Sequence, residues 1–267
     1  MKTKKLFVAI AVFMTAGLGF TACIDGNGGN SYNYNFFSPA IISSGSAAAR
    51  LTLTTWYGSL VPDSASALSL SSLPTDSCIY MNFDYNSDYQ TDSYAVASNI
   101  SYVPVTVDYI QEEDTAKVNN FTCPLSSVEL IIDASNNNLS TSLYYQGKFF
   151  VSTYAKLGQN QALQYYPYIK PDEPLDANGA RNIYLQANIP GGTLTGTKDV
   201  GTVYGLDLRN MFYSSGRDTT FNDSGVNYSL RYLKINLLYC SSIENGSPVF
   251  KSMITQPMNI YISRDDL

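Results

Sequence analysis

Residues 78–85 read CIYMNFDY, and this stretch decides the fold class. Every odd-numbered residue from Ile79 to Tyr85 is apolar or aromatic, and the even-numbered residues between them are more polar. Successive side chains of a β-strand point to opposite faces, so alternation with period two predicts a strand with one buried face. The same phasing returns in residues 183–189 and 258–262. Three such stretches predict a chain built from half-buried strands.

About ten strand-like stretches are separated by turn-forming residues, which indicates an antiparallel β-sandwich or a barrel-like fold. The remaining strand candidates are residues 51–56, 103–109, 128–132, 143–145, 149–154, 203–208 and 228–239. Asparagine and glycine in residues 136–138, 145–148 and 245–248 favour tight turns, because both tolerate positive φ. The predicted fold class is therefore all-β, as one domain or as two small β domains in series.

Residues 155–181 interrupt this pattern. Pro167, Pro171 and Pro174 lie there among polar residues and tyrosines. The segment is predicted to be either a long binding loop or a boundary between two β domains near residues 169–181.

The amino terminus has the layout of an export signal. Three lysines among the first five residues precede an apolar run over residues 6–18, and this run is shorter than the roughly 20 residues that span a bilayer. Residues 20–23 then read FTAC, which resembles the lipobox of bacterial lipoproteins, where signal peptidase II cleaves before the cysteine and the thiol is acylated. The resemblance implies a signal peptide over residues 1–22 and lipidation of Cys23, with Phe20 where leucine usually stands.

Residues 23–49 are predicted to form an acylated, flexible tether, because residues 24–31 are rich in glycine and asparagine and poor in apolar side chains. Residues 50–267 form the predicted all-β ectodomain. A lipobox followed by a short polar leader resembles the amino termini of Bacteroidetes lipoproteins. That resemblance implies anchoring in the outer membrane, at its periplasmic face or at the cell surface.

The mature chain is acidic. Without the three signal-peptide lysines, 13 basic residues stand against 22 acidic ones, which gives a net charge near −9. Such a chain repels nucleic-acid phosphates and anionic lipids, so we expect no nucleic-acid partner and a membrane contact through acyl chains only. Charged residues make up 14% of the chain, below the roughly 25% of an average domain, so Ser, Thr, Asn and Tyr must form much of the surface.

The chain contains no histidine, which narrows its chemistry. Serine–histidine and cysteine–histidine mechanisms are excluded, and the commonest zinc ligand is missing. Cys78, Cys123 and Cys240 remain after lipidation, and an odd number permits at most one intramolecular disulfide. Whether any of them pair stays open. We expect no catalytic residues and no cofactor, with calcium as the one candidate ion.

Residues 84–92 place oxygen-bearing side chains at alternate positions, and calcium binds several such hard ligands in a short loop. The candidate ligands are Asp84, Asn86, Asp88 and Asp92. Their spacing resembles the first half of an EF-hand loop, although Tyr89 occupies the position of its glycine. A calcium site and a solvated acidic strand end both fit this segment.

Tyrosines in loop-like stretches are candidate ligand-binding residues. They are Tyr165, Tyr166 and Tyr168, together with Tyr85 and Tyr89. Tyrosine rings stack on the apolar faces of sugars, while neighbouring amides bind hydroxyl groups. The alternative is that these tyrosines lie at strand edges or pack over the core. Burial of residues 165–168 would rule out the binding loop there.

Three Asp-Ser or Asp-Thr sequences resemble the short motif at which Bacteroidetes O-glycosylate exported proteins. The candidate acceptors are Ser64, Thr115 and Thr219. The resemblance implies that all three lie on exposed loops.

Together these features indicate a non-catalytic, lipid-anchored envelope lipoprotein that binds a glycan, a peptide or a partner protein through tyrosine-rich loops. One alternative is a structural fimbrial subunit or assembly component, because the export route resembles that of Bacteroidetes fimbrillins. Some of those are trimmed after an arginine near the mature start, where Arg50 stands here. A second, less favoured alternative is a glycoside hydrolase, which requires two carboxylates within roughly 5 to 10 Å.

Overall fold

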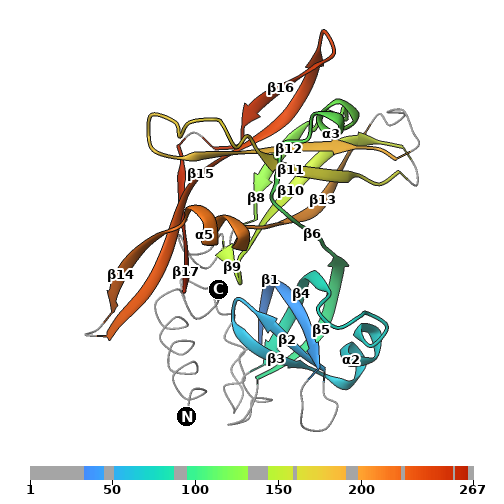
Figure 1. Ribbon diagram of the computed structural model, residues 1–267. Coiled ribbons are helices and arrows are strands. Elements are labelled where there is room, and N and C mark those ends of the chain that lie inside the picture. The colour runs from blue at the N-terminus through green and yellow to red at the C-terminus, as the bar shows by residue number, and fades with distance from the viewer. Residues whose placement is uncertain are drawn as a thin grey trace. The chain divides into compact units, whose positions relative to one another are not determined.

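The computed structural model describes residues 33–44, 51–86, 95–131, 144–158, 161–190, 198–223, 226–254 and 256–263. The chain folds into two compact units, of which the first ends at Val105 and the second begins at Thr106 (Figure 1). Both units are built mainly from strands, so the all-β prediction is confirmed. Among the described residues, no helix is both long enough and apolar enough to cross a membrane.

The first unit is a closed five-stranded barrel. Its elements are β1 (Asn33–Ser44), β2 (Leu51–Thr55), β3 (Gly58–Pro62), α2 (Ser64–Leu70), β4 (Cys78–Asn86) and β5 (Ala95–Pro104). The strand order is β1-β2-β3-β5-β4, with β3 and β5 parallel. This order, with a helix between the third and fourth strands, is that of an OB-fold barrel. Ile79, Met81 and Phe83 of β4 are buried in its core, as their alternation predicts.

β1 corrects the predicted tether, because it lies within residues 23–49. It pairs with β2 on one side and with β4 on the other, and Phe36, Ala40 and Ile42 pack in the barrel core. Residues 24–31 are rich in glycine and asparagine, but from Tyr34 onward apolar side chains begin to alternate with polar ones. The folded body therefore starts near Asn33 instead of residue 50.

The second unit contains two sheets. Its elements are β6 (Thr106–Tyr109), β7 (Gln111–Glu112), α3 (Thr115–Asn120), β8 (Ser127–Leu130), β9 (Tyr144–Tyr145), β10 (Lys148–Leu157), β11 (Gln164–Ile169), β12 (Arg181–Asn188), β13 (Lys198–Asp207), α5 (Arg209–Ser215), β14 (Arg217–Asp223), β15 (Val226–Glu244), β16 (Ser247–Ser252) and β17 (Met258–Ser263). One sheet has the order β6-β13-β10-β8, with β9 also paired to β10. The other has the order β14-β15-β12-β11-β7, with β16 and β17 also paired to β15.

The two sheets of the second unit share one hydrophobic core. Phe149, Val151 and Tyr204 of the first sheet pack in the same buried cluster as Leu185 and Ile235 of the second. The second sheet also carries a smaller cluster on its other face, where α3 and β16 cover β11 and β12. This part of the sheet is therefore buried on both faces.

Two turn predictions are confirmed. Gln146-Gly147 joins β9 to β10, and Asn245-Gly246 joins β15 to β16. Both residues of each turn have positive φ, as two-residue hairpins require. The sheets are not purely antiparallel, because β3–β5, β6–β13, β7–β11 and β12–β15 are parallel pairs.

Residues 155–181 form neither one long loop nor a boundary between units. β10 continues to Leu157, and β11 pairs with β12 within a single sheet. Residues 169–181 are the connection between these two paired strands. The division after Val105 replaces the boundary predicted from the prolines.

Candidate binding site

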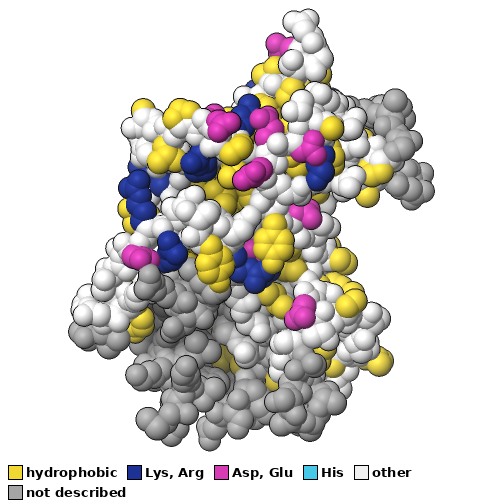
Figure 2. Space-filling model, viewed as in Figure 1, with side chains coloured by type: hydrophobic (Ala, Val, Ile, Leu, Met, Phe, Trp, Pro, Cys, Tyr) yellow, Lys and Arg dark blue, Asp and Glu magenta, His cyan; other side chains and the backbone are white. Residues whose placement is uncertain are grey.

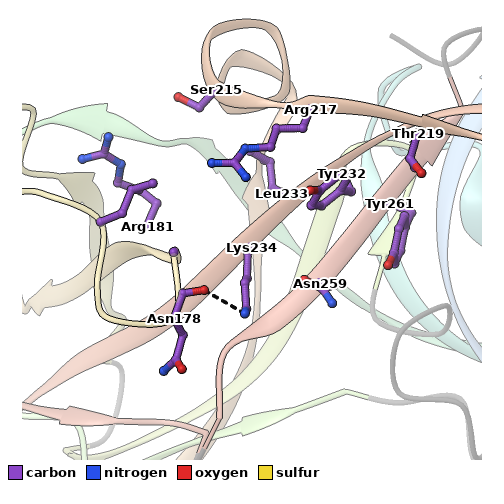
Figure 3. Close-up of a pocket in the computed structure, with 12 residues that line it drawn as sticks. Asn178, Arg181, Ser215, Arg217, Thr219, Tyr232, Leu233, Lys234, Asn259 and Tyr261 are labelled. Atoms are coloured by element: carbon purple, nitrogen blue, oxygen red, sulfur yellow. Dashed lines mark hydrogen bonds between the residues drawn. The ribbon is translucent and has the colours of Figure 1, made fainter.

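A cavity of about 500 Å³ opens on the second unit. Side chains from β14, β15 and β17 form its floor, and the end of α5 and the β11–β12 connection complete its walls (Figure 3). The cavity lies over the part of the second sheet that α3 and β16 leave uncovered.

Alternation along β15 and β17 places two tyrosines on this floor. Leu233 of β15 is buried in the core, as are Ile260 and Ile262 of β17. The residues next to each of these in sequence must face the opposite side of the sheet. Tyr232 and Tyr261 are direct cross-strand neighbours there, with ring centroids 5.9 Å apart and ring planes inclined by 36°.

Two further aromatic side chains continue this face along the β14–β15 hairpin. Phe221 and Tyr228 lie directly opposite each other and are 56% and 47% exposed. Period two puts Tyr228 on the same face of β15 as Tyr232. The exposed aromatic surface therefore extends from the cavity toward the tip of the hairpin.

Three cationic side chains line the cavity. Arg217 of β14 is the cross-strand neighbour of Tyr232, and Lys234 follows Tyr232 on the same face of β15. Arg181 begins β12 at the opposite wall. Figure 3 shows Arg217 between Arg181 on one side and Tyr232 on the other. None of the twelve described residues that line the cavity is an aspartate or a glutamate.

The polar partners of two of these cations are neutral. Nζ of Lys234 donates to the carbonyl oxygen of Asn178 at 2.8 Å. A terminal nitrogen of Arg181 donates to the carbonyl oxygen of Glu173 at 2.6 Å. The ion pairs of the described residues are Lys170–Glu113, Arg209–Asp207 and Arg231–Asp218. None of them uses a cation of the cavity, so no ion pair between described residues compensates its positive charge.

The carboxylate of Asp176 holds the β11–β12 connection in shape. It accepts hydrogen bonds from the backbone nitrogens of Asn178 and Ala180, both at 2.8 Å, and from Nδ2 of Asn236 at 2.9 Å. The bond from Ala180, followed by that from Asn236, keeps the pKa of Asp176 below its ordinary value. The loop wall that carries Asn178 is thus tied to β15 twice, through Asn236 and Lys234.

This arrangement suits binding better than acid–base chemistry. Tyrosine rings present flat apolar faces, and the amides of Asn178 and Asn259 can exchange hydrogen bonds with hydroxyl groups. A hydrolase of the two-carboxylate type needs an acid and a base in its cleft, and the described lining supplies neither. Within the described ranges, no group of three His, Cys, Asp or Glu residues could hold a metal ion.

The structure buries the tyrosines that the sequence places in a binding loop. Tyr165, Tyr166 and Tyr168 lie in β11 and are 8%, 1% and 0% exposed. Tyr165 stacks on Tyr204 with ring centroids 4.0 Å apart, and the hydroxyl of Tyr166 donates to the carbonyl oxygen of Glu112 at 2.9 Å. The binding-loop interpretation of this segment is therefore wrong, because both faces of the sheet are covered here.

The other predicted tyrosines belong to the barrel. Tyr85 lies near the end of β4, half-buried against the barrel core, where burial raises the pKa of its phenol. Tyr89 lies outside the described residues. None of the four predicted tyrosines that the structure describes lines the cavity.

The acidic segment is described only in part. Asp84 accepts hydrogen bonds from Nδ2 of Asn35 at 2.9 Å and from Nδ2 of Asn99 at 2.8 Å. These bonds, that of Asn35 first, lower the pKa of Asp84. Asn86 ends β4, whereas Asp88 and Asp92 fall outside the described residues. A calcium site therefore stays a prediction.

Two of the candidate O-glycosylation motifs start helices. Ser64 and Thr115 are exposed first residues of α2 and α3. The preceding Asp63 and Asp114 cap these helices by accepting hydrogen bonds from backbone nitrogens. Thr219 differs, because it is half-buried in β14 and lines the cavity. An Asp-Ser or Asp-Thr pair thus has a structural role at the first two places.

The remaining predictions concern cysteines. Cys78, Cys123 and Cys240 are buried and form no disulfide with one another, and burial raises the pKa of Cys240 to about 11. Cys23, the predicted lipidation site, and Arg50 lie outside the described residues.

The sequence analysis missed the cavity residues, although part of the signal was present. Residues 228–234 read YSLRYLK, in which Tyr228, Leu230, Tyr232 and Lys234 occupy alternate positions and would share one face of an extended strand. This alternation predicts a strand, and its exposed face could also have been identified. The approach of Arg181, Arg217 and Tyr261 to that strand depends on strand pairing, which no local pattern shows.

The comparisons with known proteins find similar folds only. No family model matches the chain, and no curated protein matches it. The structure is similar to that of a candidate lipoprotein from Bacteroides fragilis, with a TM-score of 0.52, 10% identity and coverage of 85% of this chain and 97% of that one. A candidate toxin-related protein from Parabacteroides distasonis gives 0.50 and 13%, with coverage of 87% and 96%.

A third similar structure is a NigD-like immunity protein from Bacteroides caccae, with a TM-score of 0.48, 12% identity and coverage of 82% of this chain and 91% of that one. This likeness is too distant to support an argument about activity. The first two comparisons show that the fold occurs in Bacteroidetes proteins, one of them a candidate lipoprotein. None of the three is named as an enzyme.

Proposed function

We propose that this chain is a non-catalytic, lipid-anchored envelope protein whose second unit binds a glycan in the cavity beside Tyr232 and Tyr261. The observation that carries the proposal is the tyrosine pair on the cavity floor, with the amides of Asn178 and Asn259 around it. Sugar rings stack on such aromatic faces, and their hydroxyls need neighbouring donors and acceptors.

The anchoring part of the proposal is supported by the amino-terminal sequence. The FTAC tetrapeptide after an apolar run resembles a lipobox, and a Bacteroides candidate lipoprotein has the same fold. An acylated Cys23 would hold the protein to the outer membrane, at its periplasmic face or at the cell surface.

Binding is favoured over fimbrial assembly by the position of the first strand. β1 is hydrogen-bonded on both sides within a closed barrel, so its release would leave β2 and β4 with open edges. Donor-strand complementation adds an extended segment to an exposed sheet edge, and the closed barrel offers no such edge beside β1. Binding is favoured over glycoside hydrolysis because Asp and Glu are missing from the described cavity lining.

A glycan array probed with the complete chain tests the binding proposal. We expect a defined set of glycans to bind, and the double variant Tyr232→Ala/Tyr261→Ala to lose at least about tenfold in affinity for them, which corresponds to about 1.4 kcal/mol. Tyr213→Ala removes an exposed tyrosine that is outside the cavity lining and serves as the matched control.

Two results would contradict the proposal. One is an array without any bound glycan, and the other is equal binding by the double variant and the control. Mass spectrometry of the native protein tests the anchor separately, since acylation must appear on Cys23.

A further inference from the structure

The cavity collects positive charge in an acidic protein. The chain has a formal net charge of −6, yet Arg181, Arg217 and Lys234 meet in one cavity without a lining carboxylate. The barrel differs, because its described residues include no Lys or Arg at all. In Figure 2 the face over the barrel strands is mostly white and yellow. The cavity thus offers an anion three cationic side chains, with no carboxylate among the described residues of its lining.

The cations stand in register with the tyrosines. Arg217, Tyr232 and Tyr261 form one row across three neighbouring strands. Lys234 and Asn259 form the next row of the same face. Adjacent strands are about 4.8 Å apart. A sugar ring that lies over the two tyrosines therefore has its substituents within roughly that distance of Arg217.

Arginine is well suited to such a substituent. Its planar guanidinium is always charged and can donate two parallel hydrogen bonds to a carboxylate or a sulfate. Arg217 is exposed and takes part in none of the ion pairs of the described residues. It can therefore pair with a ligand without first breaking an internal ion pair.

We infer that the ligand of this cavity is an acidic saccharide, with a sugar ring against Tyr232 and Tyr261 and its carboxylate or sulfate paired with Arg217. The inference rests on the proposed function and adds the charge of the ligand. A peptide rich in glutamate would satisfy the cations but would leave the two aromatic faces without a flat partner.

Binding measurements on paired saccharides test the inference. The complete chain is titrated with a galacturonic acid oligosaccharide and with its carboxyl-reduced counterpart, and then with a sulfated galactan oligosaccharide and its desulfated counterpart. We expect the charged member of at least one pair to bind at least about tenfold more tightly, and this preference to shrink as salt is added. The pair that shows the preference identifies carboxylate or sulfate as the recognised group.

Two single-residue variants test whether Arg217 causes the preference for the charged saccharide. Arg217→Gln keeps a long polar side chain and should remove most of the preference for the charged saccharide while leaving the affinity for the neutral counterpart unchanged. Lys251 is an exposed residue of β16 outside the cavity lining. Lys251→Gln changes the net charge by the same amount and should keep the preference for the charged saccharide. Unchanged urea midpoints show that both variants fold.

Several outcomes overturn the inference. The neutral saccharides bind as tightly as the charged ones, or Arg217→Gln weakens both members of a pair equally, or Lys251→Gln acts like Arg217→Gln. In these cases a glycan still binds and the proposed function stands. Equal affinity for a glutamate oligopeptide would show a general anion site and would also overturn it. If no saccharide binds, the proposed function itself fails.

Discussion

The second sheet contains two tyrosine regions, one covered by other elements and one open to the cavity. Tyr166, Tyr168 and Tyr184 stack on one another in β11 and β12, under α3 and β16. Tyr232 and Tyr261 lie on β15 and β17, where they face the cavity. Both regions belong to one sheet, and β15 reaches from one region to the other.

The difference shows that the covering elements decide which tyrosines can meet a ligand. Along β15, Leu238 packs against the buried stack, whereas Tyr232 lies on the cavity floor. The two side chains are six residues apart and point to the same face of the strand. One face of a strand can thus be part of the core at one end and part of an open cavity floor at the other, and the change occurs where the covering elements end.

The largest expected effect is a difference in the free energy of unfolding between substitutions in the two tyrosine regions. Tyr168→Ala should lower the free energy of unfolding of the second unit by about 3–5 kcal/mol, because it leaves a cavity in a fully buried stack. Tyr261→Ala removes a ring from the cavity floor and should cost less than about 1 kcal/mol. Urea unfolding followed by circular dichroism measures both values.

The two units offer a built-in control for this experiment. Trp56 is the only tryptophan and lies in the barrel, so its fluorescence follows the first unit. The fluorescence transition should stay in place in a Tyr168→Ala variant that folds. Equal destabilisation by the two substitutions would refute the distinction between covered and open tyrosines.

A smaller effect is expected from weakening the cover itself. Asp114 caps α3 by accepting hydrogen bonds from the backbone nitrogens of Ala116 and Lys117, and its own nitrogen donates to the hydroxyl of Tyr166 at 2.7 Å. Asp114→Ala should cost about 1 kcal/mol, whereas Asp114→Asn should cost little, because asparagine caps equally well. Urea midpoints measure both changes.

The asparagine variant also separates the cap from a modification signal. It preserves the cap but removes the Asp-Thr motif, so loss of a glycan from Thr115 without loss of stability would identify a second role for this aspartate. A large destabilisation by Asp114→Asn would argue against the capping account.

The smallest effect at neutral pH concerns the protonation of the buried stack. Burial, followed by the hydrogen bond to Glu173, raises the pKa of Tyr184 from 10 to about 12. A raised pKa means that the folded state holds this proton more tightly, so the stabilisation is fully present below pH 10 and is lost as pH rises through about 12. Urea midpoints of the second unit should therefore fall over this interval.

Tyr184→Phe provides the comparison for this pH dependence. It removes the titrating hydroxyl and should flatten the decline, although burial also raises the pKa of Tyr168. An identical decline in the variant would show that Tyr184 does not contribute.

Much of the fold could be predicted from local sequence, because alternation reports burial directly. β4, β12 and β17 were recognisable from aliphatic residues at every second position. β11 was not, because QYYPYI lacks alternation when both faces are buried, and Pro167 suggests a break. β1 was missed because its polar neighbours dominate the composition of the segment.

The site was less predictable, because it depends on contacts between distant parts of the chain. The clustered tyrosines of residues 165–168 predicted a binding loop. Tyr165 instead packs in the core shared by the two sheets, and α3 and β16 cover Tyr166 and Tyr168. Tyr232 and Tyr261 are isolated tyrosines in the sequence and become neighbours only through pairing of β15 with β17. Proximity in sequence therefore indicated a buried cluster, whereas strand register brings together the tyrosines of the cavity.

The early start of β1 has a consequence for the proposed membrane anchor, because it shortens the segment between Cys23 and the barrel. If Cys23 is acylated, only about ten residues separate the lipid from the barrel, and a fully extended chain of that length covers at most about 35 Å. A flexible tether that extended to residue 49 would have allowed more than about twice that distance. The barrel of an acylated chain would then stay within the shorter of these two distances from the bilayer.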